Sequence, residues 1–105
     1  MCFPSHTAAV KFDVAWEGHL FVALFGDEVP MTAPSGPKVG RSVVRVDPQD
    51  WSMHPFVKKG LLRPIDVRFN ARDGALYILD FGDFEMLAEG GLRAESGSGK
   101  VWRVR

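Results

Sequence analysis

The sequence predicts an all-β fold, and three features of the chain carry this prediction. Eleven glycines and seven prolines within 105 residues indicate frequent turns between short segments. Eight Phe, three Trp and one Tyr favour strands over helices. The apolar pattern of the first half recurs in the second half, which indicates two similar sheets. With 46% hydrophobic and 25% charged residues, the chain has the size and composition of one folded domain.

The first half of the chain is expected to contain four strands. Val10–Phe12 alternates apolar and charged residues, and Leu20–Phe25 is a continuous apolar run, as in a strand buried on both faces. Arg41–Val46 resumes the apolar pattern before an Asp-Pro turn. Trp51–Val57 contains Pro55 and is expected at a sheet edge, because proline cannot donate a ladder hydrogen bond.

The second half repeats this pattern with three strands. Val67–Phe69 matches the first of the earlier strands, with Val67 aligned to Val10, Leu76–Ile78 matches the second and Val101–Val104 the third. Asn70–Gly74 contains an Asp-Gly pair, which favours a tight hairpin turn. The sequence therefore predicts about seven strands in two units, residues 1–58 with four strands and residues 59–105 with three.

Two such units are typical of neighbouring antiparallel blades of a β-propeller, in which each sheet lies between other sheets. A two-layer sandwich is the competing interpretation, but its strands alternate apolar and polar residues, and Leu20–Phe25 does not. Two blades cannot close a ring, because propellers have about four to eight. We therefore expect either a piece of a longer protein or head-to-tail self-association through exposed blade faces, with a trimer giving six blades.

The composition disfavours several classes of protein. Thirteen Lys and Arg residues balance thirteen Asp and Glu residues, so we expect no nucleic-acid partner. No apolar run approaches the roughly 18 residues of a membrane span, and Met1–His6 lacks the pattern of a signal peptide. The single cysteine, Cys2, excludes an internal disulfide and a cysteine-rich zinc site. These features leave the compartment open.

Seven segments carry a resemblance to a known family. They are Arg63–Val67, Asp73–Asp80, Gly99–Val104, His6–Ala9, Phe21–Leu24, Pro34–Val39 and Val43–Val46. The first three resemble the final blade, and the other four the preceding blade, of the glucose/sorbosone dehydrogenase family. Members of that family are six-bladed propellers that oxidise sugars with pyrroloquinoline quinone (PQQ) and Ca2+. The resemblance covers nearly the whole chain but only about two blades, so it implies a fragment or a shortened relative.

The resemblance also implies cofactor contacts. Arg63 matches the arginine that begins the family's final-blade motif, so we expect it to bind PQQ, and Lys38 and His6 are further cofactor-binding candidates. No segment matches the family's general base or its metal-binding segment. Catalytic residues and metal ligands therefore stay unassigned. A periplasmic or secreted location follows if the chain behaves as the family does.

Strand topology places these candidates at one rim. In a sheet of consecutive antiparallel strands, the first strand begins and the second strand ends at the same end of the sheet. Arg63 and His6 precede first strands. The connections 27–39 and 83–98 follow second strands, and connections as long as these are often functional. Their acidic residues are expected to face the same mouth: Asp27, Glu28, Asp83 and Glu85.

The remaining histidines and tryptophans receive mainly structural interpretations. His19 and His54 form no metal-ligand spacing and are expected in structural or exposed roles. Trp16, Trp51 and Trp102 would stack on sugars where they are exposed, and Trp102, within a valine-rich strand, is expected in the core.

Two functions follow from these observations. The first is a PQQ-dependent sugar dehydrogenase fragment or relative that lacks the base needed for catalysis on its own. The second is a non-catalytic oligomeric propeller that binds carbohydrate or protein through its loop rim and needs no cofactor.

Overall fold

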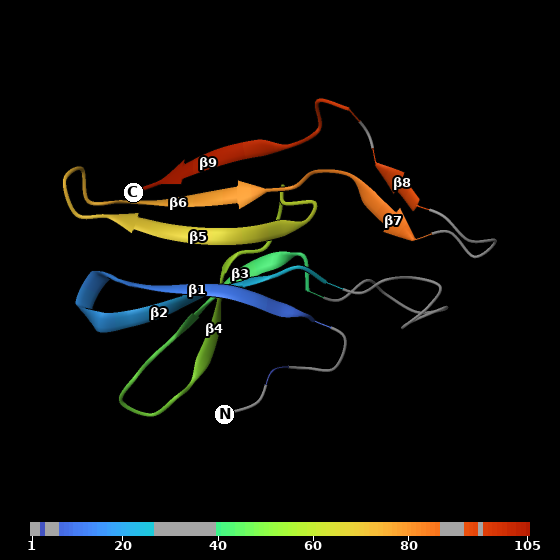
Figure 1. Cartoon of the computed structure of the whole chain (residues 1–105). Helices are drawn as coiled ribbons and strands as arrows, with labels where there is room; N and C mark the ends of the chain where they lie inside the picture. The colour runs from blue at the N-terminus through green and yellow to red at the C-terminus, as the bar shows by residue number, and fades with distance from the viewer. Residues whose placement is uncertain (1–2, 4–6, 27–39, 87–91, 95) are drawn as a thin grey trace.

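The computed structural model describes Phe3 and residues 7–26, 40–86, 92–94 and 96–105. Within these residues the chain forms strands and one short 3-10 turn (Figure 1). The elements in order are β1 (Ala9–Ala15), η1 (Trp16–Gly18), β2 (His19–Leu24), β3 (Ser42–Val46), β4 (Met53–Val57), β5 (Pro64–Asn70), β6 (Ala75–Asp80), β7 (Phe84–Met86), β8 (Leu92–Ala94) and β9 (Lys100–Val104).

Two main antiparallel sheets hold seven of these strands. Sheet A has the order β1-β2-β3-β4, and sheet B has the order β5-β6-β9. This arrangement confirms the predicted all-β class with about seven strands in sheets of four and three. β4, which contains Pro55, lies at the edge of sheet A as expected.

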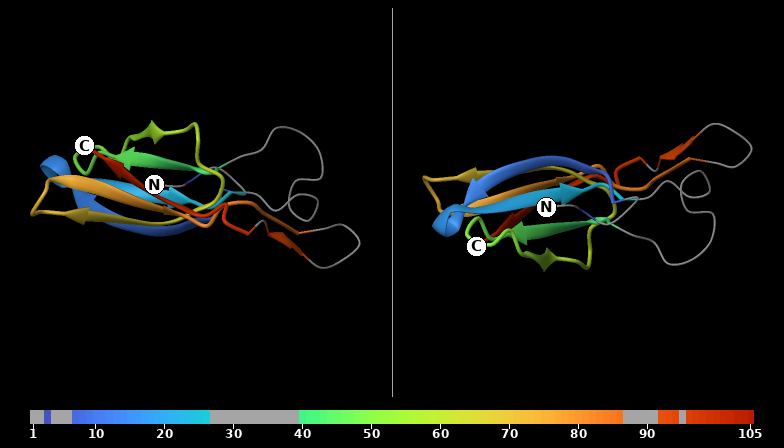
Figure 2. Two further views of the ribbon diagram at one scale, coloured as in Figure 1. Left: turned by 90° about the horizontal axis from the view of Figure 1, so that it is seen from above. Right: turned by 90° about the horizontal axis from the view of Figure 1, so that it is seen from below.

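A third, two-stranded sheet lies in the second long connection, where the sequence analysis expected only a loop. β7 pairs antiparallel with β8. The hairpin extends beyond the end of the two main sheets (Figure 2). Each of its strands has three residues, which is too short to show the period-two pattern that identified the longer strands.

The predicted Asp-Gly turn joins β5 to β6. The Gly74 N–H donates to the Asn70 carbonyl oxygen at 2.8 Å, and Gly74 has φ 68°. A positive φ costs glycine little, so this residue permits the turn. The equivalent turn of sheet A is η1, where Glu17 takes φ 58° despite its side chain.

The two sheets pack face to face through one apolar core. Its fully buried members from sheet A include Phe21, Ala23 and Val43, and those from sheet B include Leu76 and Ile78. Four aromatic rings contact one another at this core: Trp16, Phe21, Phe56 and Phe69. The Trp16 indole N–H also donates to the Gly74 carbonyl oxygen at 3.0 Å, which ties the two hairpin turns together.

Strand pairing shows the internal repeat. Val22 pairs with Val44 in sheet A, and Ile78 pairs with Trp102 in sheet B. The alignment that the sequence suggested for the second and third strands therefore relates structurally equivalent positions. Both first strands also carry a register irregularity near their start, between Ala9 and Lys11 and between Pro64 and Asp66.

The alignment that the sequence suggested for the first strands, with Val67 matched to Val10, is wrong. Val67 pairs with Ile78, and the residue that pairs with the equivalent Val22 is Phe12. Val67 is therefore the counterpart of Phe12. The sequence match missed this because an alternating pattern repeats at every second residue. A shift of this size keeps every side chain on the same face, so the error does not change which face is apolar.

Equivalent faces of the two sheets point in the same direction. Val22 and Val44 lie in a second apolar cluster on the face of sheet A that points away from sheet B. Their neighbours Ala23 and Val43 lie on the opposite face, in the core between the sheets. In sheet B, Ile78, the counterpart of Val22, faces that core. Equivalent side chains therefore point in one direction through both layers, as in a stack and unlike a symmetric two-layer sandwich.

Candidate functional site

The predicted rim is formed where β2 and β6 end and β5 begins. Arg63 immediately precedes β5, and its carbonyl oxygen accepts a hydrogen bond from the Phe81 N–H at 2.8 Å. Ala8 makes the equivalent bond with the Phe25 N–H in sheet A, at 2.9 Å. Arg63 thus lies at the end where the sequence analysis placed it, and its counterpart in sheet A is Ala8.

The Arg63 side chain is buried between the two sheets, with 1% of its surface exposed. One guanidinium nitrogen, Nη1, donates to the Phe25 carbonyl oxygen at 3.2 Å. The guanidinium carbon lies 4.7 Å from the centre of the Phe25 ring, which is cation–π geometry. The cation therefore connects the end of β2 to the start of β5.

Asp80 supports this arrangement from the last position of β6, with 2% of its surface exposed. Its carboxylate accepts hydrogen bonds from the backbone N–H groups of Leu62 and Arg63, both at 2.8 Å, and of Gly82 at 2.9 Å. These bonds satisfy a buried charge with backbone donors and fix the backbone on which Arg63 sits.

The other predicted cofactor-binding residues, Lys38 and His6, lie outside the described residues, as do Asp27 and Glu28. Asp83 is half-buried, and its N–H donates to the Ser98 hydroxyl at 2.9 Å. Within the described part of the chain, no group of three or more His, Cys, Asp or Glu side chains is arranged to hold a metal ion. PQQ and calcium binding therefore stays a prediction.

A polar pocket that the sequence analysis did not find lies at the end opposite the rim. It has a volume of about 480 Å³ and is lined by Glu17, His19, Arg45, Asp47, Pro48 and Gln49. The turn η1 supplies one wall and the connection between β3 and β4 supplies the other. Adjacent strand ends bring these residues together although they come from two separate parts of the chain.

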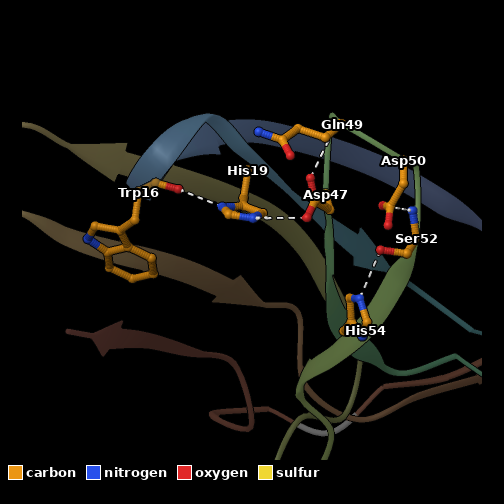
Figure 3. Close-up of polar contacts among 7 residues, drawn as sticks. All are labelled: Trp16, His19, Asp47, Gln49, Asp50, Ser52 and His54. Carbon is orange, nitrogen blue, oxygen red and sulfur yellow. Dashed lines mark hydrogen bonds and ion pairs between the residues drawn. The ribbon is translucent and has the colours of Figure 1, made fainter.

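His19 is oriented by its neighbours in this pocket (Figure 3). Its Nδ1 lies 3.0 Å from the Trp16 carbonyl oxygen, and because a carbonyl only accepts, Nδ1 carries the hydrogen. Nε2 lies 3.8 Å from an oxygen of Asp47. The other Asp47 oxygen accepts the Gln49 N–H at 2.9 Å. Asp47 thus links the histidine to the β3–β4 connection.

A second set of polar contacts follows along the same connection (Figure 3). The Ser52 hydroxyl lies 2.9 Å from His54 Nε2, and the Ser52 N–H donates to Asp50 at 2.8 Å. Hydrogen bonds from the Ser52 hydroxyl and backbone lower the pKa of the Asp50 carboxyl. The serine and histidine resemble a nucleophile and base, but Asp50 binds the serine instead of orienting the histidine. This arrangement therefore does not make a catalytic triad.

The structure confirms some of the predicted positions of histidine and tryptophan side chains and contradicts one. His54 is exposed, and His19 is half-buried in the pocket. Trp16 packs in the aromatic cluster of the core, whereas 54% of the Trp51 surface is exposed. Trp102 is 37% exposed, so its expected place in the core is wrong. It lies in β9 at the open edge of sheet B, where no fourth strand of the described chain covers it.

Both outer faces of the stack carry exposed apolar side chains. On sheet A these are Val10, Phe12 and Val14 of β1, and on sheet B they are Leu79, Phe81 and Val101. Phe12 and Val101 are the most exposed of them, at 61% and 66%. An apolar pocket of about 250 Å³ opens on the outer face of sheet A, and one of about 440 Å³ opens on sheet B.

No protein-family model, curated protein or solved structure matches the chain. In the part of the chain that the structure describes, we find no helix with the length and apolar character needed to cross a bilayer.

Proposed function

We propose that the chain is a non-catalytic assembly unit: two propeller-type blades that associate through their outer faces with further copies of the same chain. Three copies would give a ring of six blades, whose loop rim offers a surface for a carbohydrate or protein ligand. One observation carries this proposal: two exposed apolar residues on each outer face have counterparts that pack between the two sheets. These residues are Phe12 and Val14 on sheet A and Leu79 and Val101 on sheet B.

On the outer face of sheet B, Leu79 and Val101 are cross-strand partners. At the same positions in sheet A stand Ala23 and Val43, which are fully buried because sheet B covers them. The positions that are exposed on the outer face of sheet B are thus the same positions that a neighbouring sheet covers in sheet A.

On the outer face of sheet A, the counterparts are equally clear. Phe12 and Val14 correspond to Val67 and Phe69 of β5. Val67 is fully buried, and Phe69 packs against the core because sheet A covers both residues. The contact between the two sheets of one chain is therefore a template for the contact between two chains.

This template joins two different surfaces, the outer face of sheet B and the outer face of sheet A. Such a head-to-tail contact leaves one face free at each end, so association continues until a ring closes. Burial of the exposed valine, leucine and phenylalanine side chains supplies the driving force.

The test is the mass of the assembly in solution, by native mass spectrometry and light scattering. We expect three times the mass of the single chain. Phe12→Glu places a charge on the outer face of sheet A and is expected to yield folded species smaller than the ring. Arg72→Glu, at an exposed turn, is the matched control and should leave the mass unchanged. An unmodified chain that stays monomeric at every concentration overturns the proposal.

A PQQ-dependent dehydrogenase fragment is the second candidate, favoured by the position of Arg63 at the shared end of β2, β5 and β6. The described geometry fits a cofactor poorly, because the guanidinium is buried against Phe25. Titration with PQQ and Ca2+ tests this candidate by a change in quinone absorbance. Saturable binding that is weakened in a folded Arg63→Lys variant supports it, and no binding by the unmodified, folded chain rejects it.

A further inference from the structure

The pocket opposite the rim has the size of a ligand site and a polar lining. Its volume of about 480 Å³ lies within the range of about 300–1,000 Å³ for small-molecule sites. It uses neither Arg63 nor the outer faces of the sheets. The pocket is therefore separate from the surfaces of the proposed assembly.

Trp51 lies on the β3–β4 connection, which also supplies the lining residues Asp47, Pro48 and Gln49. It follows the lining residue Gln49 by two positions, and its N–H donates to the carbonyl oxygen of the lining residue Asp47 at 2.7 Å. More than half of its surface is exposed, and it belongs to neither apolar cluster. The side chain is therefore exposed on the connection that forms one wall of the pocket.

The backbone of Trp51 has a conformation that a bulky residue rarely adopts, with φ 61°. Such strain persists where surrounding bonds hold it, and it is concentrated at functional sites. Here the Asp47 N–H donates to the Ser52 carbonyl oxygen at 2.9 Å and closes the connection around the tryptophan. The loop is thus ordered before a ligand arrives, which reduces the entropy cost of binding.

The residues that line the pocket indicate the chemical class of the ligand. Glu17 and Asp47 are acidic, whereas Arg45 is cationic, and this mixture of charges does not favour a highly charged ligand. Carboxylate, guanidinium and amide groups present several hydrogen-bond donors and acceptors, which suits neighbouring hydroxyl groups. An exposed indole offers a flat apolar face to the C–H groups of a sugar ring.

We infer that this end of the molecule binds a neutral saccharide, with Trp51 as the stacking surface and Glu17, Arg45 and Gln49 as hydrogen-bond partners for its hydroxyl groups. The loop rim of the proposed assembly lies at the other end of the sheets, so the two surfaces would act separately.

Binding is tested by NMR titration of the isotope-labelled chain with glucose, N-acetylglucosamine, maltose and cellobiose. We expect at least one of them to shift the amide signals of residues 45–52 with a Kd of about 1 mM or tighter. Trp51→Phe keeps a ring and is the matched conservative variant. Trp51→Gly and Arg45→Met should each weaken binding by about tenfold or more, whereas Trp51→Phe should retain most of it.

Thermal unfolding separates this role from a structural one. Glycine tolerates the backbone conformation of Trp51, so Trp51→Gly should match or exceed the Tm of the unmodified chain while losing saccharide binding. A tryptophan that serves the fold would instead lower the Tm when removed. The inference is overturned if none of the four sugars shifts these amides, or if the folded Trp51→Gly chain binds as tightly as the unmodified one. Loss of self-association has no bearing on either result.

Discussion

Sheets A and B place similar residues at matching positions, yet the solvent exposure of those residues differs greatly. Val43 in β3 is fully buried, whereas its counterpart Val101 in β9 is 66% exposed. Both are valines in antiparallel strands at the same register position. The difference arises because sheet B covers Val43, and nothing in the described chain covers Val101. Burial at these positions thus depends on a neighbouring sheet and not on the residue itself.

The second strands of the two sheets, β2 and β6, also differ at their last residue. Leu24 ends β2 with an apolar side chain, and Asp80 ends β6 at the equivalent position with a buried carboxylate. Only Asp80 accepts backbone hydrogen bonds from the connection that leads into its sheet. Sheet B therefore uses a polar anchor where sheet A uses packing.

The largest effect is expected from making the two positions alike. Asp80→Leu places the residue type of sheet A in sheet B and leaves three backbone N–H groups without their acceptor. Each buried donor without a partner costs about 1–3 kcal/mol, so the free energy of unfolding should fall by about 4 kcal/mol. Urea denaturation measures this change, and a loss below about 1 kcal/mol would contradict an anchoring role for Asp80.

A smaller effect is expected at Gly82, which has φ 98°. A Cβ atom there would lie 2.6 Å from the Ser98 carbonyl carbon and 2.7 Å from the Gly99 nitrogen. Gly82→Ala should cost about 3 kcal/mol, because strain from the positive φ adds to steric overlap. Gly60 has φ 90° but no atom within 4 Å of an added Cβ, so Gly60→Ala should cost about 1 kcal/mol. Equal losses in denaturation would show that overlap at Gly82 is unimportant.

The next effect in size is expected at the equivalent valines of the two sheets, Val43 and Val101. Val43→Ala removes two buried methyl groups and should lower the free energy of unfolding by about 2 kcal/mol. Val101→Ala should change the stability of the dissociated chain by less than about 0.5 kcal/mol, because most of that side chain is exposed. Denaturation at low protein concentration checks both values. A larger loss at Val101 than at Val43 would reverse the assignment of covered and open faces.

The smallest expected effect is electrostatic. A hydrogen bond from the Tyr77 hydroxyl lowers the pKa of the Asp73 carboxyl, with smaller contributions from the Ala75 N–H and from Arg103. A lowered pKa in the folded state gives stability that is present above the ordinary value of 3.8 and is lost as the pH falls through the folded pKa. Tyr77→Phe should therefore raise the Asp73 pKa, as measured by NMR titration. An unchanged pKa would show that the tyrosine is not the main cause.

The sequence predicted the fold class and the two sheets because glycine, proline and apolar spacing are local signals. It identified Leu20–Phe25 as buried on both faces, and the structure confirms this for Phe21 to Leu24. It did not find the β7–β8 hairpin, whose strands are too short to show periodicity. It also misaligned the first strands, because an alternating pattern does not fix its own register.

The candidate sites were harder to predict than the fold. The sequence placed Arg63 correctly at the end shared by β2 and β6, because strand direction determines that end. It could not reveal that Phe25 covers the guanidinium, since this contact joins residues from different sheets. The pocket around His19 and Asp47 was missed because it too joins distant parts of the chain. From the sequence alone, Asp47-Pro48 indicates only a turn, because the strand that brings His19 beside it is distant in the chain.

Mixing two blocked chains tests the central claim most directly. Phe12→Glu blocks the outer face of sheet A and leaves that of sheet B intact, whereas Val101→Glu does the reverse. Each variant alone should be a folded monomer by native mass spectrometry. An equimolar mixture should form a dimer of one chain of each kind and nothing larger, because only one compatible pair of faces remains. If the mixture stays monomeric while the unmodified chain forms a ring, or if either variant forms a dimer with itself, head-to-tail stacking of the two sheets is wrong.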